Sequence, residues 1–383
     1  MKHKSQRTIN RLLFMAGILI PSILIGGTLM LRHTALGQNW LRQQWVDELS
    51  HVTSSQIEIG HVHFVQPGKY AFEDVRISDQ ESGRLICQAN HIEVEHSDKV
   101  TNLNVHTLQI PDNTPVIWIN WWNEHVLSIA EHHQLNVKIG LTMLNDQPMN
   151  AFLQNTTAQF EWSNECSKLT INWGLQQKPL ALQLTRTHQH PIASTLLLQT
   201  NDNELKLATI NKVLPLQVDL GEQATFNGQL ISKYRPGRFT SDVDFAAEGA
   251  IKHVELSKII GQHGKLAIDG LATLTLNRAV CNSNQWQRLQ GSIIGGQGTI
   301  AREWLPKLAS KLQLRWLGDL QQETVPYESL HCEFTWDPSG FTLRGESEGA
   351  YIGTILRHKN GPILGDRPES VIRSATLSEA LQR

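Results

Sequence analysis

Apolar residues recur at every second position over most of the chain after residue 55. The clearest run places them at the five alternate positions Leu135, Val137, Ile139, Leu141 and Met143. Such alternation gives a β-strand one apolar face and one polar face. Similar runs occur at Leu169–Leu175, Leu180–Leu184, Leu196–Leu198, Leu205–Leu207, Leu216–Leu220, Val243–Phe245, Leu274–Leu276, Leu312–Trp316 and Cys332–Trp336.

Turn-forming residues separate many of these runs. Gly, Pro, Asn and Asp cluster at Gln66–Lys69, Asn201–Asn203, Arg235–Gly237 and Asp337–Gly340. Strands with one polar face are typical of antiparallel sheets, whereas parallel sheets are usually buried on both faces. The pattern therefore predicts a mostly β protein whose body is an elongated antiparallel sheet, curled or groove-like, with a few short helices.

Helical spacing is confined to a few segments. Leu36, Trp40, Leu41, Trp45 and Leu49 predict a helix within residues 34–54. Further helices are expected over Trp118–His133, Val254–Ile260 and Arg302–Leu312, and a loose one over Ile372–Gln382.

The N-terminus carries a different pattern. Leu12 to Leu31 contains no charge, includes Pro21, and is bounded by Arg11 and Arg32. Twenty helical residues span about 30 Å, the thickness of a bilayer core. Basic residues before the segment outnumber those after it, so the positive-inside rule predicts a cytoplasmic tail and an extracytoplasmic body. A cleaved signal peptide is the alternative, but its apolar region would be shorter.

Two tryptophans follow this segment. Trp40 and Trp45 lie within the helix expected at 34–54. Tryptophan is common at membrane–water interfaces, so both are candidate interface residues. Packing of this helix on the β body is the alternative.

Composition excludes several classes of protein. The 383 residues include 34 Lys and Arg against 36 Asp and Glu, which gives a net charge of −2 and argues against a nucleic-acid binder. A hydrophobic fraction of 40% argues against disorder. The mean hydropathy of −0.28 excludes a polytopic membrane protein. The charged fraction is only 18% because the polar strand faces use Gln, Asn, Thr and Ser.

Catalytic and cofactor motifs are absent from the sequence. It contains no nucleophile elbow, zinc-protease motif, Walker loop or dinucleotide fingerprint, so we expect neither an enzyme nor a bound cofactor. Gly295–Gly298 only loosely resembles an anion-binding nest, and Gly261–Lys265 lacks the Ser or Thr that a phosphate loop needs. The pairs His61/His63, His188/His190 and Asp242/Asp244 each lie on one side of an expected strand, but a third ligand is not evident. We expect them to be solvated, with no metal.

Cysteine and tryptophan leave alternatives open. Cys87, Cys166, Cys281 and Cys332 would form two disulfides in an oxidising compartment, or remain free thiols. The cluster Trp118–Trp122 would pack in the core, stack on sugar rings or dock at lipid headgroups.

Strand and turn motifs after the N-terminal segment resemble the AsmA-like family of envelope proteins, a repeating β-groove type. The resemblance is carried by Ile57–Phe64, Pro67–Gly68, Phe72–Asp79, Gly83–Ile86 and Ile92–Val94, and near the C-terminus by Tyr327–Phe334 and Ser339–Gly345. It covers about a third of the chain. Members of this family have no catalytic residues to carry over, and this chain is shorter than the long bridging members.

The resemblance implies an inner-membrane anchor, a periplasmic body and a role in envelope homeostasis or lipid movement along an apolar groove. Membrane lipid, acyl chains or envelope proteins are the implied partners. The alternatives are a non-enzymatic anchored scaffold and a carbohydrate- or cell-wall-binding protein. The expected organisation is 1–33 tail and anchor, 34–54 helix, 55–115 N-terminal β module, 116–134 helical connection, 135–371 β body and 372–383 tail.

Overall fold

The computed structural model describes residues 35–97, 100–111, 120–127, 134–144, 147–148, 156–173, 179–190, 192–213, 219–235, 243–261, 268–282, 285–318, 321–347, 351–367 and 370–372. The chain divides into two compact units. Unit 1 is Met1–Thr114 with Glu131–Glu161, and unit 2 is Pro115–Ala130 with Trp162–Arg383. Both are built mainly from β-strands with a few short helices, which confirms the predicted mostly β class.

Unit 1 is a sheet that begins with an interrupted edge. β1 (Ser55–Glu58) and β2 (His61–Gln66) both pair with β3 (Lys69–Asp79), one with each half of it. Asp74 lies between the two halves with a φ of +53°, and the Gly60 N–H donates to the Glu73 carbonyl at 2.9 Å. β4 (Leu85–His96), β5 (Val100–Ile110), β6 (Gln134–Leu144) and β8 (Thr156–Trp162) follow in order, and β7 (Gln147–Pro148) also pairs with β6.

One strand pair departs from the antiparallel prediction. β5 and β6 run parallel, with Val105 opposite Ile139, whereas the other strand pairs of the described residues are antiparallel. A parallel pair requires a crossover of a dozen or more residues, and residues 111–133 supply it. The purely antiparallel prediction is therefore wrong at this position, because alternation specifies a strand's faces and not the direction of its neighbour.

The helix expected after the N-terminal segment is confirmed as α2 (Ala35–Thr53), which packs on the first strands of unit 1. The Trp45 ring lies edge-on to Tyr70 and Phe72, with centroid distances of 5.4 and 5.5 Å. The Arg42 Nη1 atom donates to the Gly60 carbonyl at 3.3 Å. Among the helices of the described residues, none combines the length and the apolar character needed to cross a bilayer.

Trp45→Ala is expected to destabilise unit 1 by about 3 kcal/mol, the low end for loss of a large aromatic side chain, because Trp45 is only partly buried. The matched control is Trp40→Ala on the same helix, whose side chain is 64% exposed and whose loss should cost less than about 0.5 kcal/mol. Thermal unfolding of the full chain in detergent measures both. Equal shifts for the two variants would show that the ring contacts of Trp45 do not hold α2 on the sheet.

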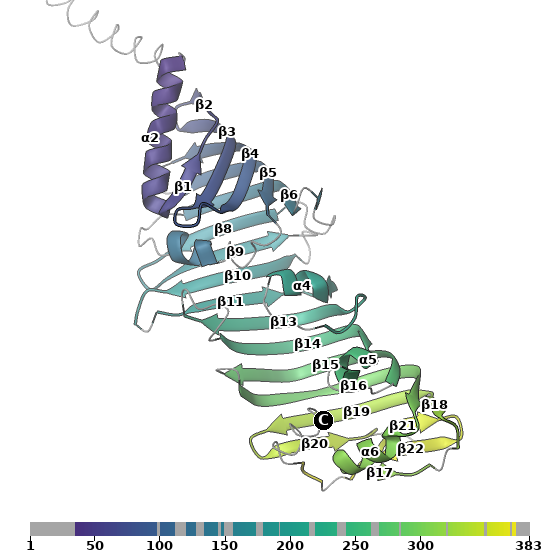
Figure 1. The fold of residues 1–383 in the computed structure, drawn as a ribbon. Helices are drawn as coiled ribbons and strands as arrows, with labels where there is room; N and C mark the ends of the chain where they lie inside the picture. Colours follow the sequence, from purple (N-terminus) through teal and green to yellow (C-terminus); the bar gives the residue numbers. More distant parts are fainter. Residues whose placement is uncertain are drawn as a thin grey trace, which may run out of the picture. The chain divides into compact units, whose positions relative to one another are not determined.

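Unit 2 is a long succession of antiparallel strands. Figure 1 shows them side by side from β9 to β16. The order is β9 (Cys166–Trp173), β10 (Leu180–Thr187), β11 (Ser194–Gln199), β13 (Thr225–Tyr234), β14 (Val243–Glu255), β15 (Ile268–Asn282), β16 (Gln285–Ala301) and β19 (Ser329–Asp337). The short strands β12 (Leu205–Lys206) and β18 (Thr324–Tyr327) pair with β13 and β16.

The C-terminal end of unit 2 closes around a hydrophobic core. β19 also pairs with β20 (Gly340–Arg344) and β21 (Thr354–His358), and β22 (Gly361–Gly365) joins β21 to β17 (Arg315–Trp316). Helices α5 (Leu256–Gly261) and α6 (Trp304–Lys311) contribute Leu256 and Leu305 to this core. Ile300, Leu356 and Ile363 are no more than 2% exposed within it.

Several element predictions can be compared with the structure. The helices at 254–260 and 302–312 correspond to α5 and α6, and the connection at 118–133 includes the short π-helix η1 (Trp122–Val126). The strand predicted at 205–207 is wrong at its end, since α4 (Leu207–Val213) begins there. Asp219 and Leu220 are not in a strand, and residues 216–218 and 373–382 lie outside the described residues.

Candidate functional site

A continuous apolar row crosses nine strands of unit 2. We call it the nine-strand row, and we call the sheet face that carries it the inner face. Each member lies opposite the next in the strand register, so one residue from each hydrogen-bonded strand contributes to the line. The members are Ile171, Leu182, Leu198, Leu230, Ala247, Ala279, Leu289, Trp336 and Phe341. With about 4.8 Å between strands, eight steps give a row about 38 Å long.

Neighbouring rows widen the apolar surface. Leu169, Leu184 and Leu196 lie beside the row on β9 to β11. Leu276, Phe334 and Leu343 lie beside the row on β15, β19 and β20. The strand register continues their line through three glycines, which are Gly228, Gly249 and Gly291. The inner face therefore has a second apolar line beside the nine-strand row on β9 to β11 and another on β15, β19 and β20.

Burial changes along the nine-strand row. Its first six members, from Ile171 to Ala279, are 1–8% exposed. Leu289, Trp336 and Phe341 are only partly buried, and Leu289 and Phe341 pack against the C-terminal core. The accessible part of the row is therefore the end formed by β16, β19 and β20.

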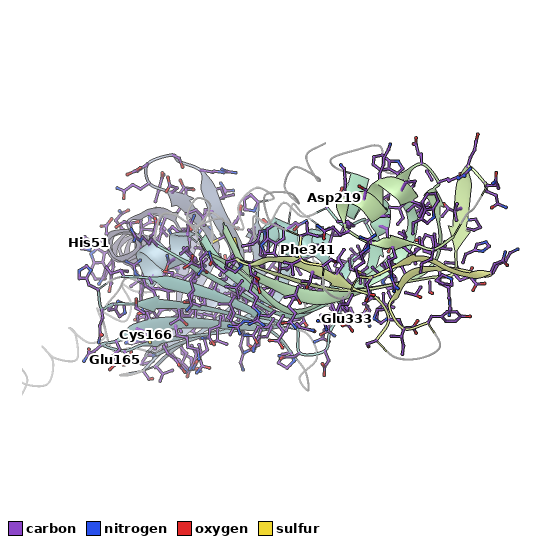
Figure 2. All side chains as sticks on the ribbon, turned by 90° about the horizontal axis from the view of Figure 1, so that it is seen from below. His51, Glu165, Cys166, Asp219, Glu333 and Phe341 are labelled. Carbon is purple, nitrogen blue, oxygen red and sulfur yellow. The ribbon has the colours of Figure 1, made fainter. Side chains whose placement is uncertain are left out.

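The opposite face of β19 and β20 is polar. On β19, Glu333 lies on the other side of the strand from Phe334 and Trp336, and it opposes Arg344 of β20. Phe341 and Glu333 are labelled in Figure 2 and belong to these two opposite faces. At β19 and β20 the sheet of unit 2 thus has an apolar inner face and a polar outer face.

A buried polar row borders the apolar surface. Ser194 Oγ donates to Asn123 Oδ1 of η1 at 2.7 Å, and Arg186 Nη1 donates to the Asn123 carbonyl. Burial lowers the pKa of the Arg186 guanidinium, and Glu124 partly offsets this effect. Burial also raises the pKa of Tyr234, which is opposite Ser194 in the register. The hydrogen bonds from Ser194 and Arg186 to Asn123 hold η1 on the sheet.

The tryptophan cluster is part of this packing. The Trp121 indole is 5% exposed and lies edge-on to Trp122 at a centroid distance of 5.0 Å. A sugar ring needs an exposed indole face, so Trp121 offers no stacking surface. Trp118 lies outside the described residues.

The predicted membrane residues divide into two groups. Arg11, Leu12, Pro21, Leu31 and Arg32 lie outside the described residues, so the anchor stays a prediction. Trp40 is exposed, whereas Trp45 makes the ring contacts expected if the helix packs on the body.

Within the residues that the structure describes, neither histidine pair joins a third metal-ligating side chain. His61 and His63 stack at 6.3 Å, and His63 Nε2 lies 3.6 Å from Glu73 Oε1. His188 follows the end of β10, and its Nε2 hydrogen-bonds with Ser167 Oγ at 2.7 Å. Asp242 lies outside the described residues. The one group of three metal-ligating side chains within the described part of the chain is His91, Glu93 and His106, which the sequence search did not identify.

The glycine segments have structural roles. Gly295 to Gly298 lies inside strand β16 and not in a turn before a helix. Tyr327 packs over Gly298, where an added Cβ would meet its hydroxyl at 2.3 Å, and this hydroxyl donates to the Asp269 carbonyl at 2.6 Å. Gly261 ends α5, and residues 262–267 lie outside the described residues.

All four cysteines are free thiols. Burial raises the pKa of Cys87 and of Cys332 to about 12, so at pH 8 only about one such thiol in ten thousand is ionised. In the native full chain, we expect Cys166, which is partly exposed, to react first with a thiol reagent, and Cys87 and Cys332 to react last. Unfolding should expose four thiols per chain. Titration with a chromogenic disulfide measures this, and fewer than four thiols in denaturant would indicate a disulfide.

Comparisons with known proteins identify no relative. No family model, curated protein or solved structure matches the chain.

Proposed function

We propose that this protein is a membrane-anchored envelope protein whose unit 2 binds lipid acyl chains along the inner face. The observation that carries the proposal is the accessible end of the nine-strand row, where Leu289, Trp336 and Phe341 form a continuous apolar line and are only partly buried. Each methylene removed from water on such a surface contributes about 0.8 kcal/mol. A non-directional apolar surface suits acyl chains, which have no hydrogen-bonding groups of their own.

The predicted N-terminal anchor supplies the location. A segment without charge from Leu12 to Leu31 would keep the body at the outer surface of the cytoplasmic membrane. Lipid would then be available to the body at high local concentration. The resemblance to the AsmA-like envelope family supports the same role in envelope homeostasis, without catalysis.

An anchored scaffold is the second candidate. The near-complete burial of the row from Ile171 to Ala279 favours it, because a fully packed face leaves no surface for a ligand. The two candidates therefore differ in what contacts the partly buried end of the row.

Photo-crosslinking in native membranes distinguishes them. Phe341 of the full chain is replaced by p-benzoylphenylalanine, and the matched control carries the same residue at Thr342, the next position on the opposite face. After irradiation, the washed membranes are dissolved in denaturant and the chain is analysed by mass spectrometry. We expect lipid adducts at position 341 and at least tenfold fewer at 342.

A second pair at Trp336 and Thr335 repeats the comparison on β19. Equal adduct yields on the two faces, or no lipid adduct at 336 and 341, would overturn lipid binding. Cross-links to protein alone would favour the scaffold.

A further inference from the structure

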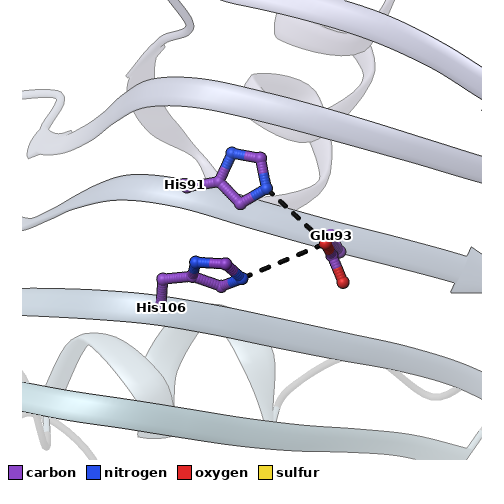
Figure 3. Close-up of side chains that lie close together, drawn as sticks. All are labelled: His91, Glu93 and His106. Atoms are coloured by element: carbon purple, nitrogen blue, oxygen red, sulfur yellow. Dashed lines mark ion pairs between the residues drawn. The ribbon is translucent and has the colours of Figure 1, made fainter.

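Three side chains with metal-ligating atoms lie together on the polar face of unit 1. Glu93 Oε1 lies 3.7 Å from His91 Nε2 and 4.0 Å from His106 Nε2. The two imidazole rings have a centroid distance of 4.6 Å, and Figure 3 shows both pointing toward the carboxylate. The ligand atoms of all three residues lie within 4.8 Å of one another.

The strand register creates this cluster. His91 and Glu93 are two residues apart on β4, so both project from the same face, while Ile92 between them projects from the other. Ile92 opposes Val105 of β5, which places the next residue, His106, on the same face as His91 and Glu93.

We propose that His91, Glu93 and His106 bind one Zn²⁺ ion. Two imidazoles and one carboxylate form a common zinc ligand set, and three protein ligands leave a fourth position for water. Bonds of about 2.0–2.1 Å in tetrahedral geometry place neighbouring ligand atoms about 3.3 Å apart. The observed separations of 3.7 and 4.0 Å from the carboxylate exceed this by less than 1 Å, and the two histidine ligand atoms lie within 4.8 Å of each other, so side-chain rotations would bring the three ligands to bonding distance.

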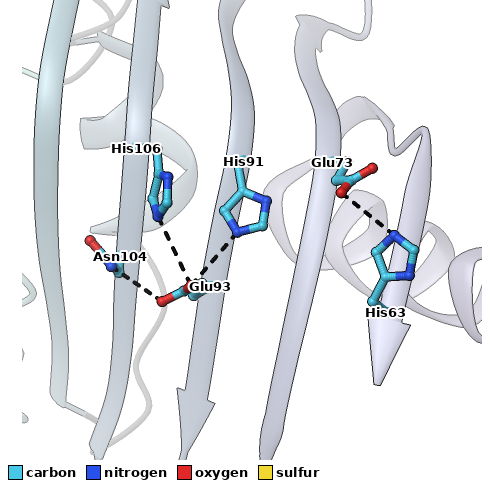
Figure 4. Close-up of polar contacts among 6 residues, drawn as sticks. All are labelled: His63, Glu73, His91, Glu93, Asn104 and His106. Carbon is cyan, nitrogen blue, oxygen red and sulfur yellow. Dashed lines mark hydrogen bonds and ion pairs between the residues drawn. The ribbon is translucent and has the colours of Figure 1, made fainter. Parts of the chain in front are cut away.

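A neighbouring amide orients the carboxylate. Asn104 is opposite Glu93 in the register, and its Nδ2 donates to Glu93 Oε2 at 3.2 Å. The oxygen nearest the two histidines, Oε1, is the other one, as Figure 4 shows. Removing a group that hydrogen-bonds to a metal ligand typically weakens metal binding by about 10- to 100-fold.

The surroundings admit a hydrated cation. The side chains of His91, Glu93 and His106 are 29%, 55% and 53% exposed. The small residue Ala71 lies opposite Glu93 on β3, and Glu73 lies opposite His91. Glu73 adds a negative charge beside the site. Its Oε1 atom also lies 3.6 Å from His63 Nε2.

Zinc titration of the full chain in detergent, after removal of metals with a chelator, tests the site. We expect one tight Zn²⁺ site per chain by competition with a chromogenic chelator. Co²⁺ as a substitute should give the visible absorption of a four-coordinate ion. Mg²⁺ should not compete, because it prefers oxygen ligands.

Variants separate this site from adventitious binding by the other histidines. His106→Ala and Glu93→Gln are each expected to weaken Zn²⁺ binding at least tenfold, and Asn104→Ala about tenfold. The matched control is His63→Ala, a histidine of the same face outside the cluster, which should leave affinity within about twofold. Circular dichroism confirms that each variant is folded. Absence of a tight site, or equal loss in His63→Ala and His106→Ala, would overturn the proposal.

Discussion

Replacing Gly249 with alanine is expected to destabilise unit 2 by more than about 4 kcal/mol. Gly249 has a φ of +143°, which L side chains rarely adopt, and it lies opposite Gly228, whose φ is +156°. A Cβ added at Gly249 would lie 2.2 Å from the Asn227 carbonyl oxygen and 2.6 Å from the Gly228 Cα. Both neighbours are backbone atoms of β13. The steric clash can therefore be relieved only if the two strands move apart.

Gly296→Ala is the matched control for this prediction. Gly296 also lies within a strand, but an added Cβ would have no atom within 4 Å. We expect its effect on the free energy of unfolding to be within about 0.5 kcal/mol of zero. Denaturant unfolding of the full chain measures both variants. A Gly249→Ala protein as stable as Gly296→Ala would show that β13 and β14 are not as closely apposed as the structure indicates.

Leu289→Glu is expected to reduce lipid adducts at position 341 by at least tenfold, if unit 2 binds acyl chains as proposed. Leu289 lies next to Trp336 in the nine-strand row, and Trp336 is next to Phe341. A carboxylate at this point must be desolvated when an acyl chain covers it, at a cost of several kcal/mol. That exceeds the contribution of about 0.8 kcal/mol from a single methylene, and about 1.4 kcal/mol already corresponds to a tenfold change.

Gln290→Glu supplies the same charge on the opposite face of the same strand. Adduct yields at 341 should be unchanged in this variant, because Gln290 lies between Arg278 and Thr335 and the outer face is already polar there. Leu289 is only partly buried, so Leu289→Glu should remain folded, which thermal unfolding checks. Equal adduct yields in the two variants would indicate that lipid does not lie along this row.

The sequence predicted individual strands better than their arrangement. Alternating leucines identified β10 and β11, because one half-buried face leaves a direct trace in the residue order. β5 was not identified, since its polar face carries Asn102 and Asn104 and only Leu103 and Val105 mark its apolar side. The parallel β5–β6 pair left no local signal at all.

Both candidate sites are assembled across neighbouring strands by the strand register. The spacing of residues along the sequence gives no information on that register. The nine-strand row combines one residue from each of nine strands, so no short motif could reveal it. His91 and Glu93 were visible as an alternate pair on one strand, but His106 joins them only through the pairing of Ile92 with Val105. A search that aligned neighbouring strands by their apolar positions would have found this cluster.

The interleaved division of the chain has a consequence for its synthesis. Residues 115–130 belong to unit 2, although the chain on both sides of them belongs to unit 1. Asn123 receives its hydrogen bonds from Arg186 and Ser194, which are 63 and 71 residues later. At about 5–20 residues per second, a ribosome needs roughly 3 to 14 s to add these residues. During that interval, the strands β6 and β8 of unit 1 are completed while η1 still lacks the polar groups that hold it.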